Sequence, residues 1–302
     1  MNMKGIYRSV FLLAFGGMLF FSCKSDRTGR LADKYKDTET GEIVEKITEI
    51  KKVYNLCPSP AEMLSIIDVA EMQFKTDLLN QTGNADKYLD TRSLTVNLGV
   101  YATDLAYAAL FGRHEETIDY LEVVQDIADK VRVTGTINEK LIERAKNNIN
   151  YIDSLFNISN EAFINMIFFC EKNERPGTVI LISTGAFIES LYLAASMIEV
   201  YNVESYMIQH LADQKYAIDN LMAFAESDAT IPNVNDAIAL LKPLAEIFDQ
   251  IQDANGSTSV KKEATGKLVV GGKSKTTLSE SDFIKLKETV AKVRNDIISN
   301  SL

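Results

Sequence analysis

The chain contains no tryptophan, and only two histidines, three cysteines and five prolines occur among its 302 residues. Two histidines leave little material for a histidine-based metal site, and three cysteines exclude a small domain held together by disulfides. With 15 glycines added to the prolines, residues that break helices are still few. The composition therefore favours long helices over a β architecture rich in turns.

Basic residues are fewer than acidic ones. The chain has 32 Lys and Arg residues against 42 Asp and Glu residues, which gives a formal net charge of −10. A protein that binds DNA or RNA needs a basic surface to contact the phosphate backbone, so nucleic acid is excluded as a partner. Hydrophobic residues, in contrast, make up 46% of the chain, which is enough to build a core and predicts a folded domain.

The first residues have the pattern of a targeting segment. Lys4 and Arg8 supply positive charge, and an apolar run follows at residues 10–21. A helix needs about 20 apolar residues to span a membrane, so this shorter run is typical of a signal peptide. The run ends in Phe-Phe-Ser-Cys, with the cysteine at position 23. This ending resembles the lipobox of bacterial lipoproteins in the form that Bacteroidota-type bacteria use.

The lipobox resemblance implies that residues 1–22 are removed as a signal peptide and that Cys23 is acylated. Several acyl chains on one cysteine give stable membrane anchoring. Lys24, rather than Asp, follows the cysteine, which favours the outer membrane and leaves the periplasmic or surface face open. The polar residues 23–42 are predicted to be a flexible tether. An ordinary secretory signal with an incidental cysteine is the alternative.

Residues 43–302 are predicted to form one all-α domain, a multi-helix bundle or short α-superhelix of about nine helices. Ser59, Pro60 and Glu62 have the spacing of a capping box at a helix start. Around residues 256–278 the helical periodicity is lost, and β-prone arms around Gly271-Gly272 predict a small β-hairpin or a mobile insertion. The apolar periodicity predicts further helices at residues 93–111, 115–133, 138–156, 160–172, 178–201, 203–227, 233–254 and 280–299.

Two of these helices share a sequence pattern. Both contain Gly-x-aromatic-x-x-x-Leu-x-x-Ala-Ala, beginning at Gly99 in one and at Gly185 in the other. The match is compatible with a duplicated four-helix unit whose halves are about 92–173 and 177–300. Chance similarity between apolar helices is the alternative.

Each of the two helices also carries one isolated acid, Asp104 in the first and Glu189 in the second. Tyr107 and Tyr192 follow these acids at i+3 on the same helix face, where a hydroxyl can donate to a carboxylate. A buried carboxylate has to find hydrogen bonds or keep its proton. Three explanations stay open: structural acids satisfied by their tyrosines, a ligand pocket lined by all four residues, or catalysis by paired carboxylates.

Other motifs fall short of a site. His114 begins an acidic helix start, but Ile118 stands where a zinc-binding helix needs its second histidine. The glycines near Lys273 do not have the spacing of a phosphate-binding loop. Cys57 and Cys170 are compatible either with a disulfide or with two buried thiols. No metal and no cofactor are therefore expected.

The stretches 54–60, 97–107 and 185–192 resemble a group of uncharacterised helical lipoproteins from Bacteroidota-type bacteria. The resemblance implies a fold and a location but no chemistry. The leading hypothesis is a lipid-anchored outer-membrane protein, held at the membrane by Cys23, that acts as a non-catalytic binding or scaffolding module. Its partner would be an envelope protein or a small ligand. The alternative is an enzyme that uses Asp104 or Glu189 in a helical cleft.

Overall fold

The chain is divided at residue 48, and the second unit comprises residues 49–302. All residues described in the computed structural model belong to the second unit. Residues 1–22, Cys23, the tether and Cys57 lie outside the described residues. The described residues are 58–67, 69, 71–133, 135–148, 150–251, 253–254, 259–262, 268–271 and 275–301.

The described part of the chain is all-α, as the sequence predicts, and contains nine α-helices. Between the first two helices run two short 3-10 helices, η1 (Thr76–Leu78) and η2 (Thr82–Lys87), within a segment of residues 75–88 that we call the strap. The α-helices are α3 (Pro60–Leu64), α4 (Thr91–Leu110), α5 (His114–Lys130), α6 (Glu139–Asn147), α7 (Ile152–Lys172), α8 (Pro176–Met197), α9 (Tyr206–Ser227), α10 (Val234–Phe248) and α11 (Glu280–Ile298).

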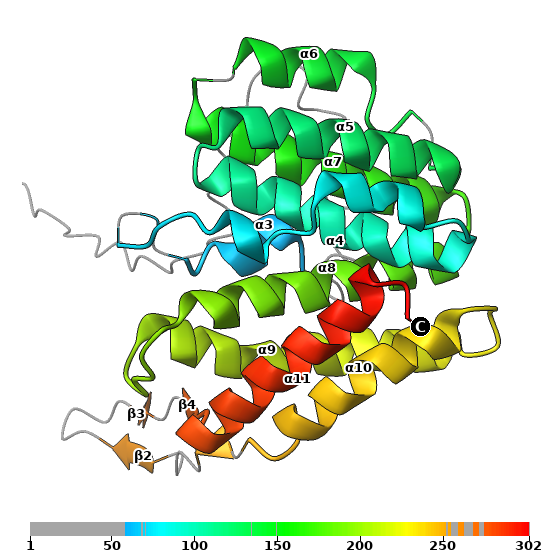
Figure 1. Cartoon of the computed structure of the whole chain (residues 1–302). Helices are drawn as coiled ribbons and strands as arrows, with labels where there is room; N and C mark the ends of the chain where they lie inside the picture. Colours follow the sequence, from blue (N-terminus) through cyan, green and yellow to red (C-terminus); the bar gives the residue numbers. More distant parts are fainter. Residues whose placement is uncertain are drawn as a thin grey trace, which may run out of the picture. The chain divides into compact units, whose positions relative to one another are not determined.

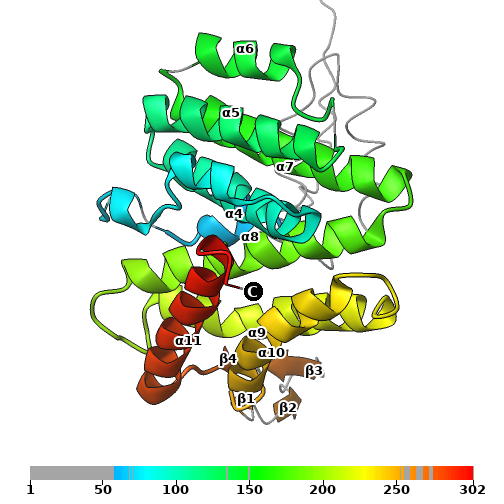
Figure 2. The same cartoon turned by 45° about the vertical axis from the view of Figure 1, so that its right-hand side comes forward.

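Helices α4 and α8 lie side by side at the centre of this unit (Figure 1). Helices α5, α6 and α7 lie on the α4 side, and α9, α10 and α11 lie on the α8 side, in both views (Figure 2). Most residues of α4 and α8 are buried, including those on opposite faces of each helix. A helix that is apolar all round packs inside a core, whereas the more amphipathic α5, α6 and α10 turn one face outward.

By length and composition alone, α8 also qualifies as a candidate membrane span among the described residues. However, 89% of its most apolar window is buried inside the protein. Its apolar surface is therefore covered by the neighbouring helices, as in the central helix of a core.

The two central helices cross at the glycines of the shared sequence pattern. A Cβ added to Gly99 would lie 2.0 Å from the carbonyl oxygen of Ile182, and one added to Gly185 would lie 2.0 Å from that of Val96. Each glycine thus faces the carbonyl three residues before the other glycine, so the contact is reciprocal. Backbones approach this closely only where no side chain intervenes. Such an approximate two-fold contact agrees with a duplicated unit, which stays a prediction.

The boundary between α6 and α7 differs from the expected one. The sequence pattern predicts a break at residues 157–159, whereas α7 continues through them and the chain breaks after Asn147 instead. The side chain of Asn148 donates a hydrogen bond to the carbonyl oxygen of Arg144 at 2.7 Å. Asparagine competes with the backbone in this way and favours helix ends, which apolar periodicity alone does not reveal.

The predicted N-cap before α3 is confirmed, because the Ser59 hydroxyl accepts a hydrogen bond from the N–H of Glu62 at 3.2 Å. Pro60 is the first residue of the helix, where its missing N–H costs no hydrogen bond. The strap that follows was not predicted from the sequence.

The insertion forms two short antiparallel pairs, β1 (Asp253–Ala254) with β4 (Lys275–Thr276) and β2 (Ser259–Lys262) with β3 (Leu268–Gly271). The strands differ from the predicted hairpin, because β3 pairs with β2, which precedes it in the chain, and not with a strand that follows Gly271-Gly272. This register places Val260 opposite Val270, so that residues with high β propensity face each other across the pair.

Candidate functional site

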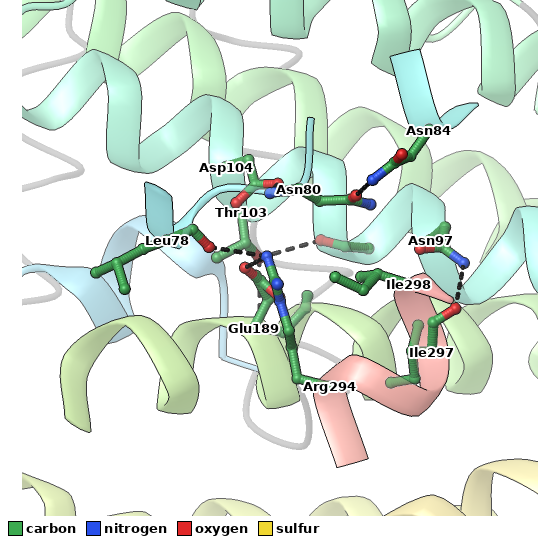
Figure 3. A network of polar contacts seen from close by, with 12 residues as sticks. Leu78, Asn80, Asn84, Asn97, Thr103, Asp104, Glu189, Arg294, Ile297 and Ile298 are labelled. Carbon is green, nitrogen blue, oxygen red and sulfur yellow. Dashed lines mark hydrogen bonds and ion pairs between the residues drawn. The ribbon is translucent and has the colours of Figure 1, made fainter. Parts of the chain in front are cut away.

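The two isolated acids meet near the crossing of the central helices. Asp104 on α4 and Glu189 on α8 are both 0% exposed. Each acid lies about one turn after the glycine at which its helix contacts the other, so the close approach of the backbones brings the carboxyl groups together. Arg294 of α11, also buried, reaches the same point (Figure 3).

Arg294 binds Glu189 through two parallel hydrogen bonds. Its Nε donates to Oε2 at 2.9 Å, and its Nη2 donates to Oε1 at 3.1 Å. The same Nη2 also donates to the carbonyl oxygen of Leu78 in the strap at 2.8 Å. The ring of Tyr192 lies under the guanidinium, with 4.7 Å between the ring centroid and Cζ. A bidentate ion pair stacked on an aromatic ring is a strong and directional arrangement for a buried charge.

Asp104 is bound less completely. Its Oδ2 accepts a hydrogen bond from the backbone N–H of Asn80 at 3.1 Å. Its other carboxyl oxygen, the buried Oδ1, has no hydrogen-bond partner among the described residues. Burial raises the pKa of both carboxyls, and the charge of Glu189 raises the pKa of Asp104 further, well above its ordinary value. Arg294 opposes the rise in the pKa of Glu189.

The same buried groups hold the strap in place. The hydroxyl of Tyr120 on α5 donates to the carbonyl oxygen of Asn80 at 2.9 Å, and that of Tyr101 on α4 donates to the carbonyl oxygen of Gln81 at 3.0 Å. Arg294 also binds the carbonyl oxygen of Leu78, and Asp104 accepts from the N–H of Asn80. Side chains of three helices thus bind four backbone polar groups between residues 78 and 81. Buried backbone outside regular structure needs such partners, and the cluster supplies them.

The tyrosines at i+3 do not satisfy the acids, so that prediction is wrong. The hydroxyl of Tyr107 accepts a hydrogen bond from the N–H of Lys75 at 3.2 Å and donates to Sδ of Met197 at 3.3 Å. Tyr192 presents its ring to the guanidinium of Arg294. A tyrosine side chain is longer than that of an acid, so its hydroxyl extends past a carboxyl on the same helix face.

Arg294 and Asn80 were missed by the sequence reasoning. Arg294 did carry a signal, because it lies between Val290 and Ile297 in the apolar stripe that α11 turns toward the core. A charged residue inside such a stripe is expected to be buried with a partner. Asn80 carried no signal, since it belongs to the irregular part of the strap.

Cys170 is the described member of the cysteine pair considered above. It is buried on α7, and burial raises the pKa of its thiol to about 11, so the thiol stays protonated at neutral pH. Its suggested partner, Cys57, lies outside the described residues.

The hydrogen bonds of the cluster join Arg294 to Glu189 and run from Arg294 and Asp104 to the backbone of the strap. The described residues contain no group of three or more His, Cys, Asp or Glu side chains placed to hold a metal ion. Asp104 and Glu189 therefore lie in one buried cluster, as the hypothesis of a shared site predicts. The side chain that binds Glu189 there is Arg294 and not one of the two tyrosines. Comparison with protein family models, curated proteins and solved structures finds no match to this chain.

Proposed function

We propose that the protein is a lipid-anchored protein of the outer membrane whose helical domain binds or scaffolds a partner without catalysis. The full burial of the Asp104, Glu189 and Arg294 cluster carries the non-catalytic part of this proposal. A catalytic acid has to come within hydrogen-bond reach of its substrate. Here the hydrogen-bonding groups of the cluster are directed at one another and at the backbone of the strap.

The anchoring part rests on the sequence. A basic start, a short apolar run and the Ser22-Cys23 ending are together the pattern of a cleaved and acylated N-terminus. The resemblance to helical lipoproteins of Bacteroidota-type bacteria supports the same location. The polar residues that follow Cys23 have the composition of a spacer between membrane and domain. A protein of the cell envelope or a small ligand is the proposed partner.

Cys23→Ala tests the anchor. We expect the wild-type protein to sediment with membranes and to carry fatty acyl groups on an N-terminal Cys23, because the thiol is the acylated atom. The variant should incorporate no labelled fatty acid, which mass spectrometry and metabolic labelling will measure. Ser25→Ala, two residues further on, is the matched control and should be acylated like the wild type. A wild-type protein without acyl mass would contradict the proposal.

The role of the acids in binding is tested by capture of the intact lipoprotein from detergent-solubilised envelopes. Wild type and Asp104→Asn are captured in parallel, and bound proteins and small molecules are identified by mass spectrometry. The non-catalytic proposal expects the same bound material with both, because the cluster does not contact a partner. Loss of one specific small molecule in the variant would instead favour the alternative, an enzyme or ligand site built on Asp104 and Glu189.

A further inference from the structure

The buried cluster contains two carboxyls and one guanidinium. If both acids were ionised, an uncompensated negative charge would lie in the core, which is one of the costliest arrangements in a folded protein. A proton on one of the two buried carboxyls removes the uncompensated charge and leaves Arg294 paired with a single carboxylate. One of the two acids therefore carries a proton in the folded protein.

We propose that Asp104 is a proton-binding site: at neutral pH it keeps a proton, and loss of this proton at alkaline pH opens the strap. The proposal is independent of the membrane anchor and of any partner. It assigns to Asp104 a protonated carboxyl, which the sequence of α4 alone does not indicate.

The unequal partners of the two acids place the proton on Asp104. Glu189 accepts two hydrogen bonds from the positive charge of Arg294, which stabilise its ionised form. Asp104 accepts one bond from a neutral backbone N–H, that of Asn80. The shifts agree, since the pKa of Asp104 is raised by burial and by Glu189, whereas the charge and hydrogen bonds of Arg294 hold back the rise in the pKa of Glu189.

The other ionisable groups around Asp104 do not compensate a second negative charge. Apart from Arg294 they are tyrosines, and burial raises the pKa of each of them, so they stay neutral below strongly alkaline pH. Besides Glu189 of α8 and Arg294 of α11, the groups that interact with Asp104 are Tyr101 and Tyr107 of α4, Tyr88 of the strap and Tyr120 of α5.

The strap is the element expected to respond when the proton leaves. The acids cannot separate easily, because α4 and α8 are in backbone contact at Gly99 and Gly185. The second charge must then be solvated, and water can enter where the covering segment is not part of a long helix. The strap meets this condition, since its backbone lies against the cluster at residues 78–81.

Infrared spectroscopy tests the proton directly. At neutral pH the wild-type protein should show the C=O stretching band of a buried protonated carboxyl, and Asp104→Asn should lack it. Asp129→Asn, which changes an exposed acid, should keep the band. An absent band in the wild type, or a band that persists in Asp104→Asn, would overturn the proposal.

Amide exchange of the strap tests the opening. An asparagine at position 104 imitates the protonated acid, because its amide is uncharged and its oxygen can still accept from the N–H of Asn80. Stability from a carboxyl whose folded pKa is raised is full below its ordinary pKa and is lost as pH rises through the folded pKa. After correction for intrinsic exchange, protection of residues 78–81 should fall at alkaline pH in the wild type and persist in Asp104→Asn. Equal loss in both proteins would refute the switch.

Discussion

Gly99→Ala and Gly185→Ala are each expected to destabilise the helical domain by about 3 kcal/mol or more, the upper range for overpacking a core. The added methyl group would lie 2.0 Å from a backbone carbonyl oxygen of the facing helix. A backbone carbonyl inside a helix cannot rotate away as a side chain can, so α4 and α8 would have to move apart. Denaturant unfolding of the purified domain measures the change as a lower midpoint.

Gly83→Ala is the matched control for these substitutions. A Cβ at Gly83 meets nothing within 4 Å, so the change in unfolding free energy should stay within about 0.5 kcal/mol. The double variant of Gly99 and Gly185 should cost less than the sum of the single changes, because one separation of the helices accommodates both methyl groups. Single variants as stable as Gly83→Ala would show that the helices do not cross at these glycines.

Glu189→Gln is the second change with a large expected effect, a loss of about 3–5 kcal/mol in unfolding free energy. It removes the bidentate partner of Arg294 and leaves a buried positive charge without its main counterion. Asp104→Asn should cost less than about 1 kcal/mol at neutral pH, because the hydrogen bonds of a protonated acid are replaced by those of an amide. Thermal or denaturant melts of the two variants at one pH separate these outcomes.

Glu199→Gln controls for the loss of an ordinary ion pair. Glu199 binds Lys75 but its side chain is 76% exposed, so its removal should leave the unfolding midpoint almost unchanged. The double change Glu189→Leu with Arg294→Met removes both buried charges and should recover most of the stability lost in Glu189→Gln. A Glu189→Gln protein as stable as Glu199→Gln would mean that the cluster is open to water.

Much of the fold could be predicted because it follows from local properties of the sequence. Few glycines and prolines, together with apolar residues at helical spacing, predicted an all-α domain, and seven of the eight long helices begin within three residues of the expected position. The exception is α7, where Asn147 and Asn148 end the preceding helix early. Asp104 and Glu189 could be singled out because a lone charge in an apolar helix is visible from its neighbours alone.

Only the tertiary structure decided what these acids do. Arg294 lies 105 residues after Glu189, and Asn80 lies 24 residues before Asp104. Residues so far apart in the sequence meet only because of how the helices cross and where the irregular segments lie. The apolar periodicity of a single helix contains neither kind of information. The sequence by itself therefore determined most of the helices and the apolar faces that they bury. The crossing at Gly99 and Gly185 determined that two acids share one arginine, since carboxyl groups interact strongly only when the backbones that carry them are held close.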